Sequence, residues 1–450
     1  MSGSDTGSGT GSDTGTGPDA ASGPGPGAGP GAGAGAGAGA GQDYRRPRLR
    51  SDVVLGPGLR SGPKVLHHIK DERTGCYYRI GAREHFIMGL MDGSRTLDDI
   101  GRAYEDTYQR RLGPANWQQI FTLLGRYQLL DGHTDPAVLD RLRAAHEEKQ
   151  AAQQNWLHRR WVMMRPDGLC AVLAQRLSVL FHRAFVIPAL LVLLALQIYV
   201  WSRFDVLIED TGEQNHWAIT VPLSLLLAWL ITMGHELAHG VSCRYFGGRV
   251  TEIGVRWRFP FLAPYCRTDD IVLFQRRTAR VATAFAGSFV SLLAMIPVAV
   301  WWRLTEDGHQ QHALAAALLL FGSGGALVNM LPFFQLDGYV MLTHALGIAD
   351  LRRDATTWWR LRLTSRKPTA QEQLAAYPAR EARIYAGYGA ASALFLTTAY
   401  AALMWLWFRT LDHWMPAGWA VAILAAETAV LAGVVALAAK ARTRGERTHG

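Results

Sequence analysis

Long apolar runs alternate with shorter polar connections over most of the chain after residue 183. Each run is almost free of charge and is near or above the length of about 18 to 25 residues that a helix needs to cross a hydrocarbon layer of ~30 Å. The pattern therefore predicts six membrane-spanning helices. They occupy residues 184–201, 217–233, 281–302, 313–331, 384–408 and 419–438.

The charge of the connections between these runs predicts how the chain is oriented. The connection 240–280 contains eight arginines and 339–383 contains eight Lys or Arg, whereas 202–216 and 303–311 are poor in basic residues. Basic connections stay in the cytoplasm. We therefore expect a multi-pass protein of the cell membrane with both termini in the cytoplasm, and all four cysteines then lie on the reducing side.

The overall charge has a simple explanation in this topology. The chain carries 46 Lys and Arg against 37 Asp and Glu, a net charge of +9. Most of this excess flanks the apolar runs, where topology and contact with anionic lipid account for it. We expect the lipid bilayer as a partner and no nucleic acid. Four cysteines without a CxxC pair also exclude a disulfide-stapled secreted protein.

The segment before the first apolar run is polar and has two parts. Residues 1–41 hold 16 of the 47 glycines, which predicts a disordered tail, and it lacks the basic start and apolar stretch of a signal peptide. Residues 64–71 and 76–80 predict a hairpin with a turn at 72–75. Helical patterns follow at 82–91, 97–111 and 115–130, the second capped by Thr96 with Asp98 and Asp99.

The predicted fold class is therefore mainly α: a polytopic helical membrane protein with a small α+β, winged-helix-like cytoplasmic domain. The stretch GCYYRIGAREHFIMGLMDGSRTLDDIGRAYEDTYQ, with the later YQLLDG, resembles the PqqD-like peptide-recognition domain of ribosomal-peptide maturation systems over residues 60–135. That resemblance implies a sheet edge that binds a leader peptide by strand addition. A helical adaptor is the alternative, and a DNA-binding winged helix is disfavoured because no recognition helix is rich in base-reading side chains.

Two further segments frame the membrane part. Residues 136–183 predict a linker made of a polar helix followed by an amphipathic helix that leads into the first span. After the fourth span, 346–383 is expected to form a basic cytoplasmic loop, and 384–450 two accessory spans with a basic tail. This division places a membrane core at residues 184–345.

The second predicted span ends in the motif His235-Glu236-Leu237-Ala238-His239. Residues four apart lie on one face of a helix, so both imidazoles can bind one metal ion while Glu236 stands beside them. Three ionisable groups that continue an apolar helix are costly unless they act together. Because a catalytic zinc usually takes three protein ligands and a water molecule, a third ligand is expected from elsewhere.

The fourth span ends in GSGGALVNMLPFFQLDGYVML, which places Asn329, Pro332 and Asp337 at a cytoplasmic membrane boundary. An isolated carboxylate at that depth is best explained as a ligand, and the topology puts Asp337 level with His235. The motifs HExxH and N-x-x-P-x-x-x-L-D-G together resemble the site-2 protease family of intramembrane zinc metalloproteases.

The resemblance implies a role for each residue of the two motifs. His235, His239 and Asp337 would hold Zn²⁺, Glu236 would act as general base, and Asn329 would position or polarise the scissile carbonyl. Pro332 is expected to kink its helix so that Asn329 and Asp337 face the ion. Residues 248–270 alternate like strands and resemble the membrane-associated sheet whose edge holds an extended substrate in this family.

Other metal-binding side chains carry less weight. Cys243 follows His239 by four residues, but a fourth protein ligand would leave no open position for water. His216, His309, His312 and His413 are expected to be boundary residues, and His182 precedes the first span without a partner motif.

The sequence predicts a membrane zinc metalloendopeptidase that acts near the cytoplasmic face. Its substrate could be a ribosomally made peptide delivered by a leader, or a membrane-anchored regulator or transmembrane helix cut by regulated intramembrane proteolysis. A non-proteolytic zinc-binding membrane scaffold is the alternative of another class, while a transporter would be expected to show further intramembrane carboxylates or broken helices.

Overall fold

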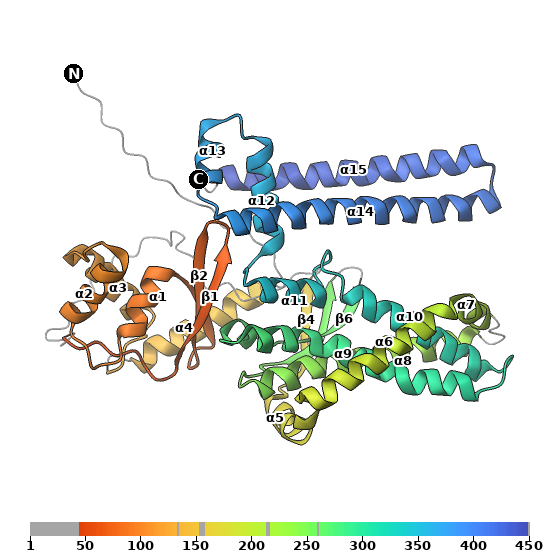
Figure 1. Ribbon diagram of the computed structural model, residues 1–450, viewed down its shortest axis with the longest axis horizontal. Coiled ribbons are helices and arrows are strands. Elements are labelled where there is room, and N and C mark those ends of the chain that lie inside the picture. Colours follow the sequence, from red (N-terminus) through yellow and green to blue (C-terminus); the bar gives the residue numbers. More distant parts are fainter. Residues whose placement is uncertain (1–44, 133–134, 153–157, 213–216, 259–260, 449–450) are drawn as a thin grey trace. The chain divides into compact units, whose positions relative to one another are not determined.

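The computed structural model describes residues 45–132, 135–152, 158–212, 217–258 and 261–448 (Figure 1). The predicted tail 1–41 and His216 lie outside these residues. Among the described residues the chain forms two compact units, one ending at Asp350 and one beginning at Leu351. The described residues form fifteen α-helices and two three-stranded sheets, so the protein is mainly α, as predicted.

The first unit begins with a small sheet followed by three helices, which we call the N-terminal module. Its antiparallel strands are β1 (Val53–Ser61), β2 (Lys64–Asp71) and β3 (Cys76–Gly81), in that order across the sheet. The helices are α1 (Ala82–Leu90), α2 (Leu97–Tyr108) and α3 (Pro114–Arg126). The predicted hairpin and the three predicted helices are confirmed, and Thr96 forms a capping box with Asp99.

Strand β1 was not predicted, because Gly56, Pro57 and Gly58 interrupt its apolar pattern. The register against β2 shifts between Leu55 and Gly58, so the interruption is absorbed as a local irregularity. One apolar core joins the sheet to the helices. Its buried members are Ile69, Cys76, Tyr78, Ile80, Ile87, Met88, Met91, Ile100, Tyr104, Leu124, Leu129 and Leu130.

The linker after the module contains a strand as well as helices. Helix α4 (Pro136–Ala152) comes first, then β4 (His158–Met164), α5 (Asp167–Arg176) and the short 3-10 helix η1 (Ser178–Phe181). β4 pairs with β5 (Ile253–Arg258), which pairs with β6 (Phe261–Cys266). The strands predicted in 248–270 are thus confirmed, whereas β4 was missed because its partner lies almost 100 residues away in the sequence.

Five helices, not six, are long and apolar enough to cross a membrane among the described residues. They are α6 (Arg183–Ser202), α8 (Trp217–Tyr245), α9 (Arg277–Leu304), α10 (Gln310–Asn329) and α14 (Ala379–Trp414). The sixth predicted run lies in α15 (Ala417–Thr448), whose apolar part counts as the shorter helix Ala417–Gly433. Among the described residues the count is therefore five, where six spans were predicted.

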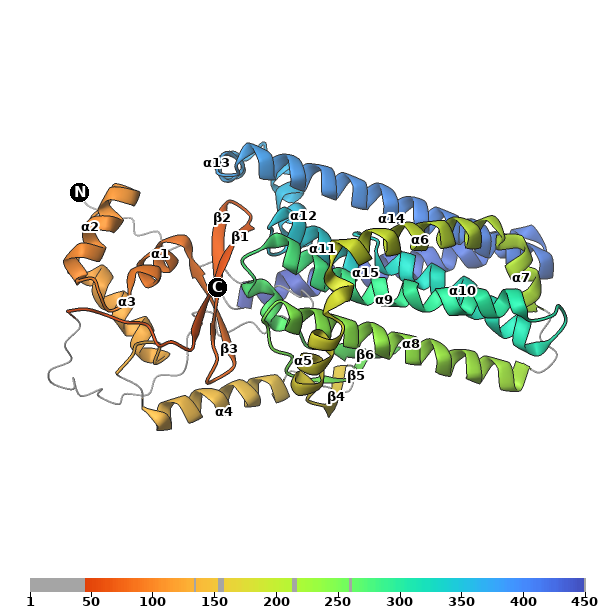
Figure 2. The same cartoon turned by 60° about the horizontal axis from the view of Figure 1, so that its bottom comes forward.

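Within the first unit, α8, α9 and α10 run alongside one another (Figure 2). α10 is the central helix, since 61% of its apolar window is buried against 33% or less for α6, α8 and α9. Short elements connect these helices: α7 (Phe204–Gly212), the 3-10 helix η2 (Asp269–Leu273) and α11 (Asp337–Leu346). Contacts of α9 with α8, α10 and α11 bring the two sequence motifs together.

The predicted kink at Pro332 is wrong. Helix α10 ends at Asn329, and α11 begins only at Asp337. Proline lacks an amide hydrogen and its ring clashes with the carbonyl four residues earlier, so it ends this helix rather than bending it.

The second unit consists of α12 (Leu351–Leu363), α13 (Pro368–Ala375), α14 and α15. The segment 346–383, expected as a basic loop, is therefore largely helical. Two hydrogen bonds join α12 to α14, from Tyr385 to Asp354 and from the Trp359 indole to the Ala386 carbonyl.

Candidate metal centre and catalytic residues

Helix α8 positions the two histidines of the HExxH motif on one face. One helical turn separates them, so both rings point to the same place, and their Nε2 atoms lie 3.2 Å apart. His235 is buried and His239 half-buried. The predicted convergence of these two imidazoles is present.

Asp337 reaches the same place from the first turn of α11. Its Oδ2 atom lies 3.0 Å from Nε2 of His235 and 3.3 Å from Nε2 of His239. Gly338 permits this arrangement, because a Cβ at that position would lie 2.0 Å from the carbonyl oxygen of Met330. The connection between α10 and α11 can therefore fold back tightly and carry the carboxylate to the histidines.

The three side chains fit a zinc ion. They form the one group of three or more metal-binding side chains found among the described residues, with ligand atoms all within 4.8 Å of one another. Ligand atoms 2.0–2.1 Å from a tetrahedral zinc lie roughly 3.3 Å apart. The observed separations of 3.0, 3.2 and 3.3 Å agree with that geometry.

Each imidazole is also fixed from its far side. Nδ1 of His239 lies 2.8 Å from the Thr283 carbonyl oxygen, which can only accept a hydrogen bond. Nδ1 of His235 lies 3.0 Å from Oγ of Ser291. Donation from Nδ1 leaves the lone pair of Nε2 available to a metal, and such outer partners orient the ring.

Helix α9 supplies the partners that sequence reasoning missed. Thr283 and Ser291 bind the imidazoles, and Ser288 donates to Oδ2 of Asp337 at 3.3 Å. At Gly287 a Cβ would lie 2.4 Å from Nε2 of His239 and 2.5 Å from Nε2 of His235. The only sequence signal was the small-residue stretch AFAGS within an apolar run, which is typical of close helix packing in membranes.

Asn329, the last residue of α10, contacts the same carboxylate. Its Nδ2 donates to Oδ2 of Asp337 at 2.7 Å and to Oγ of Ser288 at 3.3 Å. The structure therefore brings Asn329 to the site, with its amide directed toward Asp337.

Glu236 lies beside the three candidate ligand side chains and is held by the sheet. Its Oε2 accepts a hydrogen bond of 2.8 Å from the backbone amide of Cys266 on β6. Burial, followed by the nearby Glu236 carboxylate, holds the pKa of the Cys266 thiol well above its ordinary value. The thiol therefore stays protonated next to the carboxylate at neutral pH.

The remaining predicted residues lie elsewhere. The buried Cys243 thiol points to the Arg249 carbonyl oxygen at 3.9 Å and is not part of the group. His312 is more than a boundary residue, since its Nε2 lies 2.9 Å from Oδ2 of Asp210 and joins α10 to α7. His309 and His413 are exposed, and His182 occupies the N-cap position of α6 without a side-chain cap hydrogen bond.

No protein-family model and no solved structure matches the chain. The chain is similar to one curated protein of Bacillus subtilis (strain 168), named "Putative peptide zinc metalloprotease protein YydH", with 28% identity over 126 residues. The aligned segment makes up 28% of this chain and 48% of that protein. The chain thus matches about half the length of this relative.

Proposed function

We propose that this protein is a membrane-embedded zinc metalloendopeptidase of the site-2 protease type, which cleaves a peptide bond near the cytoplasmic face of the cell membrane. The observation that carries the proposal is the convergence of His235, His239 and Asp337, with Glu236 beside them. The name of the similar Bacillus subtilis protein, which includes the words peptide zinc metalloprotease, supports it.

In this proposal His235, His239 and Asp337 hold Zn²⁺, which when bound lowers the pKa of a coordinated water and polarises a carbonyl group. Glu236 takes a proton at its carboxylate and passes it to the leaving amine. Ser291 and the Thr283 carbonyl orient the imidazoles. Asn329, held at 2.7 Å from Asp337, can turn its amide toward the substrate carbonyl.

The outer edge of β6, with which no strand pairs in the described part of the chain, is the proposed binding site for the scissile segment. The Arg267 amide donates to the Glu252 carbonyl on the β5 side. Since backbone groups alternate in direction along an antiparallel strand, the Cys266 backbone faces away from β5, toward Glu236. An extended peptide that pairs with this edge would lie beside the general base.

The N-terminal module, resembling PqqD-like domains over residues 60–135, is proposed to recruit a leader peptide. One edge of its sheet is already used, because Arg60 on β1 exchanges backbone hydrogen bonds of 2.8 Å with Gly347 and Ala349. β3 forms the opposite edge, and no strand pairs with its outer side among the described residues. Leader removal from a ribosomally made peptide is therefore the reaction that we favour over cleavage of a membrane-anchored regulator.

The test is cleavage of a co-expressed candidate precursor peptide, followed by mass spectrometry with and without a chelator. Glu236→Gln should abolish cleavage while the purified protein keeps stoichiometric zinc. Glu306→Gln, a change at an exposed carboxylate, serves as the matched control. Unchanged processing by Glu236→Gln would show that Glu236 is not the general base. If the unaltered protein binds zinc but cleaves no peptide, the non-proteolytic scaffold would be the better interpretation.

A further inference from the structure

A buried carboxylate helps to close the base of the hairpin β5–β6. Asp270, in η2, is 5% exposed, and its Oδ2 accepts a hydrogen bond of 2.8 Å from the backbone amide of Arg249. Arg249 follows the end of α8, and Asp270 follows the end of β6. Asp270 therefore ties together the two ends of the segment 249–270, which leaves the HExxH helix and returns beside Glu236.

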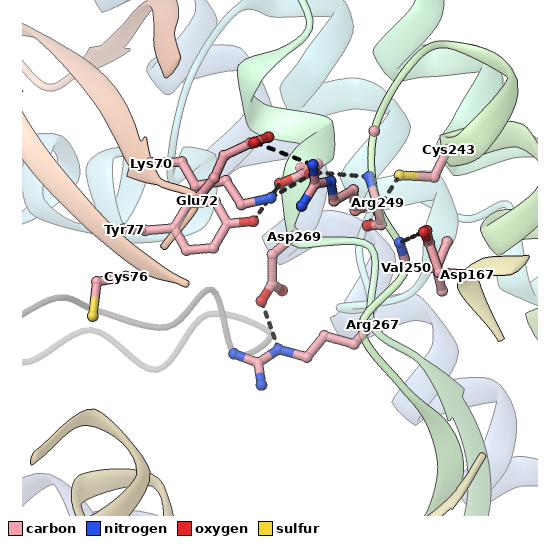
Figure 3. A network of polar contacts seen from close by, with 12 residues as sticks. Lys70, Glu72, Cys76, Tyr77, Asp167, Cys243, Arg249, Val250, Arg267 and Asp269 are labelled. Carbon is pink, nitrogen blue, oxygen red and sulfur yellow. Dashed lines mark hydrogen bonds and ion pairs between the residues drawn. The ribbon is translucent and has the colours of Figure 1, made fainter. Parts of the chain in front are cut away.

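The N-terminal module provides the cation and the hydroxyl that stabilise this carboxylate. Lys70 on β2 lies 2.6 and 2.8 Å from the two oxygens of Asp270, and the Tyr77 hydroxyl on β3 donates to Oδ1. Figure 3 shows both side chains pointing from the module toward the loops that carry Arg249 and Asp269. Lys70 and Tyr77 are themselves buried, at 5% and 8% exposure.

Among the ion pairs of the described residues, only the one with Lys70 involves Asp270. The neighbouring carboxylate of Asp269 has its own partner, Arg267, at 2.6 Å. The other ion pair between module and segment joins Glu72 to Arg249 at 3.2 Å, where the arginine side chain is 55% exposed and water weakens the attraction. A buried carboxylate that loses its cationic partner is strongly destabilised, because its charge is then uncompensated in a medium of low dielectric constant.

The segment 249–270 also donates a hydrogen bond to the proposed general base, Glu236 on α8. Cys266, whose amide donates to Oε2 of Glu236, lies four residues before Asp270. A shift of η2 therefore moves the amide that fixes Glu236 and the edge of β6 that would receive the substrate. Misplacement of catalytic groups by about 1 Å can lower a rate by about a hundredfold.

We propose that the N-terminal module acts in catalysis through this contact: Lys70 and Tyr77 are positioning residues that hold Asp270, and thereby β6 and Glu236, in the arrangement that cleaves. This inference rests on the proposed function and goes beyond recruitment of a leader peptide. A module that only recruits would raise the affinity for peptides that carry a leader and would leave the turnover of a leaderless peptide unchanged. A module that positions Glu236 is needed for both.

The experiment uses the full-length, zinc-loaded protein in lipid nanodiscs and compares a leader-bearing peptide with a leaderless one. Lys70→Met should lower kcat for both peptides by about tenfold or more, with little change in KM for the leaderless peptide and with unchanged zinc content. Adding Asp270→Asn to Lys70→Met should restore part of kcat, because a neutral amide needs no counter-charge. Lys64→Met, the same substitution at an exposed position of the same strand, is the control.

A second measurement does not depend on activity. Backbone hydrogen exchange of peptides covering 261–275 should become faster in Lys70→Met. If Lys70→Met does not fold, Tyr77→Phe, which removes only the hydroxyl, takes its place, and the same increase is expected. Unchanged exchange, or a loss confined to KM for the leader-bearing peptide, would overturn the inference. If the unaltered protein cleaves neither peptide but exchange is still faster in the variant, the result would support the coupling and count against the proposed function instead.

Discussion

The backbone amide of Cys266 donates a hydrogen bond of 2.8 Å to Oε2 of Glu236, although 30 residues separate the two in the sequence. The donor is a main-chain group, so its position depends on the path of β6 and not on the side chain of Cys266. The carboxylate of the HExxH motif is thereby fixed to a sheet edge as well as to its own helix.

Removal of the proposed carboxylate ligand should release the metal. Asp337→Ala leaves two imidazoles, which is one protein ligand fewer than catalytic zinc usually has. We expect the purified variant to lose bound zinc, measured by elemental analysis after dialysis, and to lose cleavage with it. Asp307→Asn, at a side chain that is 95% exposed, should retain both. Full zinc occupancy in Asp337→Ala would show that this aspartate is not a ligand.

Gly287→Ala should damage the site although the residue carries no functional group. The added Cβ would lie 2.4 and 2.5 Å from the two Nε2 atoms, closer than any real contact, so that α9 or the imidazoles must move. We expect at least a tenfold loss of cleavage, roughly what loss of a partner of a metal ligand costs. At Gly325 on α10 an added Cβ meets nothing within 4 Å. Gly325→Ala is therefore the matched control, and equal activity of both variants would contradict the expectation.

Ser291→Ala should weaken zinc binding without removing a ligand. The hydroxyl is the partner of Nδ1 of His235 at 3.0 Å, and its loss frees the ring to rotate. Outer partners of this kind are typically worth 10- to 100-fold in metal affinity or activity. Competition with a chromogenic chelator measures the affinity. Ser291→Thr keeps the hydroxyl and should stay near the unaltered protein, whereas equal affinity in Ser291→Ala would make the contact incidental.

The sequence predicted the three side chains that converge at the candidate metal centre, but not the residues that only shape it. His235, His239 and Asp337 are visible because ionisable groups in apolar runs are costly. Gly287 and Ser288 look like ordinary packing residues of a span. They contact the site only because α9 packs against α8, and the sequence does not show which helices pack together. β4 was invisible for a related reason, because its strand partner lies in another segment.

Local sequence signals succeeded where the structure is determined locally. The turn at 72–75 and the cap at Thr96 need only neighbouring residues, and both the hairpin and the capping box are present. Pro332 was recognised as a disturbance of the helix, but whether a proline bends or ends a helix depends on what the following residues can contact. There Gly338 lets the chain fold back onto Met330, and the helix ends.

The folded protein should be less stable in mild acid than at neutral pH. Burial, followed by the charge of Arg79, lowers the pKa of His68 on β2 to about 4 from an ordinary 6.5, with a smaller effect from His67. His344 on α11, buried near Arg280 and His68, has a pKa lowered to about 3. The unfolded state therefore binds more protons between about pH 6.5 and pH 4, and stability falls as the pH falls through that window.

His68→Leu removes one of these groups and should flatten the acid dependence of thermal unfolding. Nδ1 of His68 is buried without a hydrogen-bond partner, so the substitution breaks no bond at that atom. A pKa difference of this size corresponds to about 3 kcal/mol at the low end of the window. We expect the melting temperature of His68→Leu to fall less than that of the unaltered protein between pH 6.5 and pH 4. His309→Leu, at an exposed histidine, is the control and should leave the acid dependence as it is. If the melting temperature falls equally with pH in all three proteins, protonation of His68 does not contribute to the acid dependence.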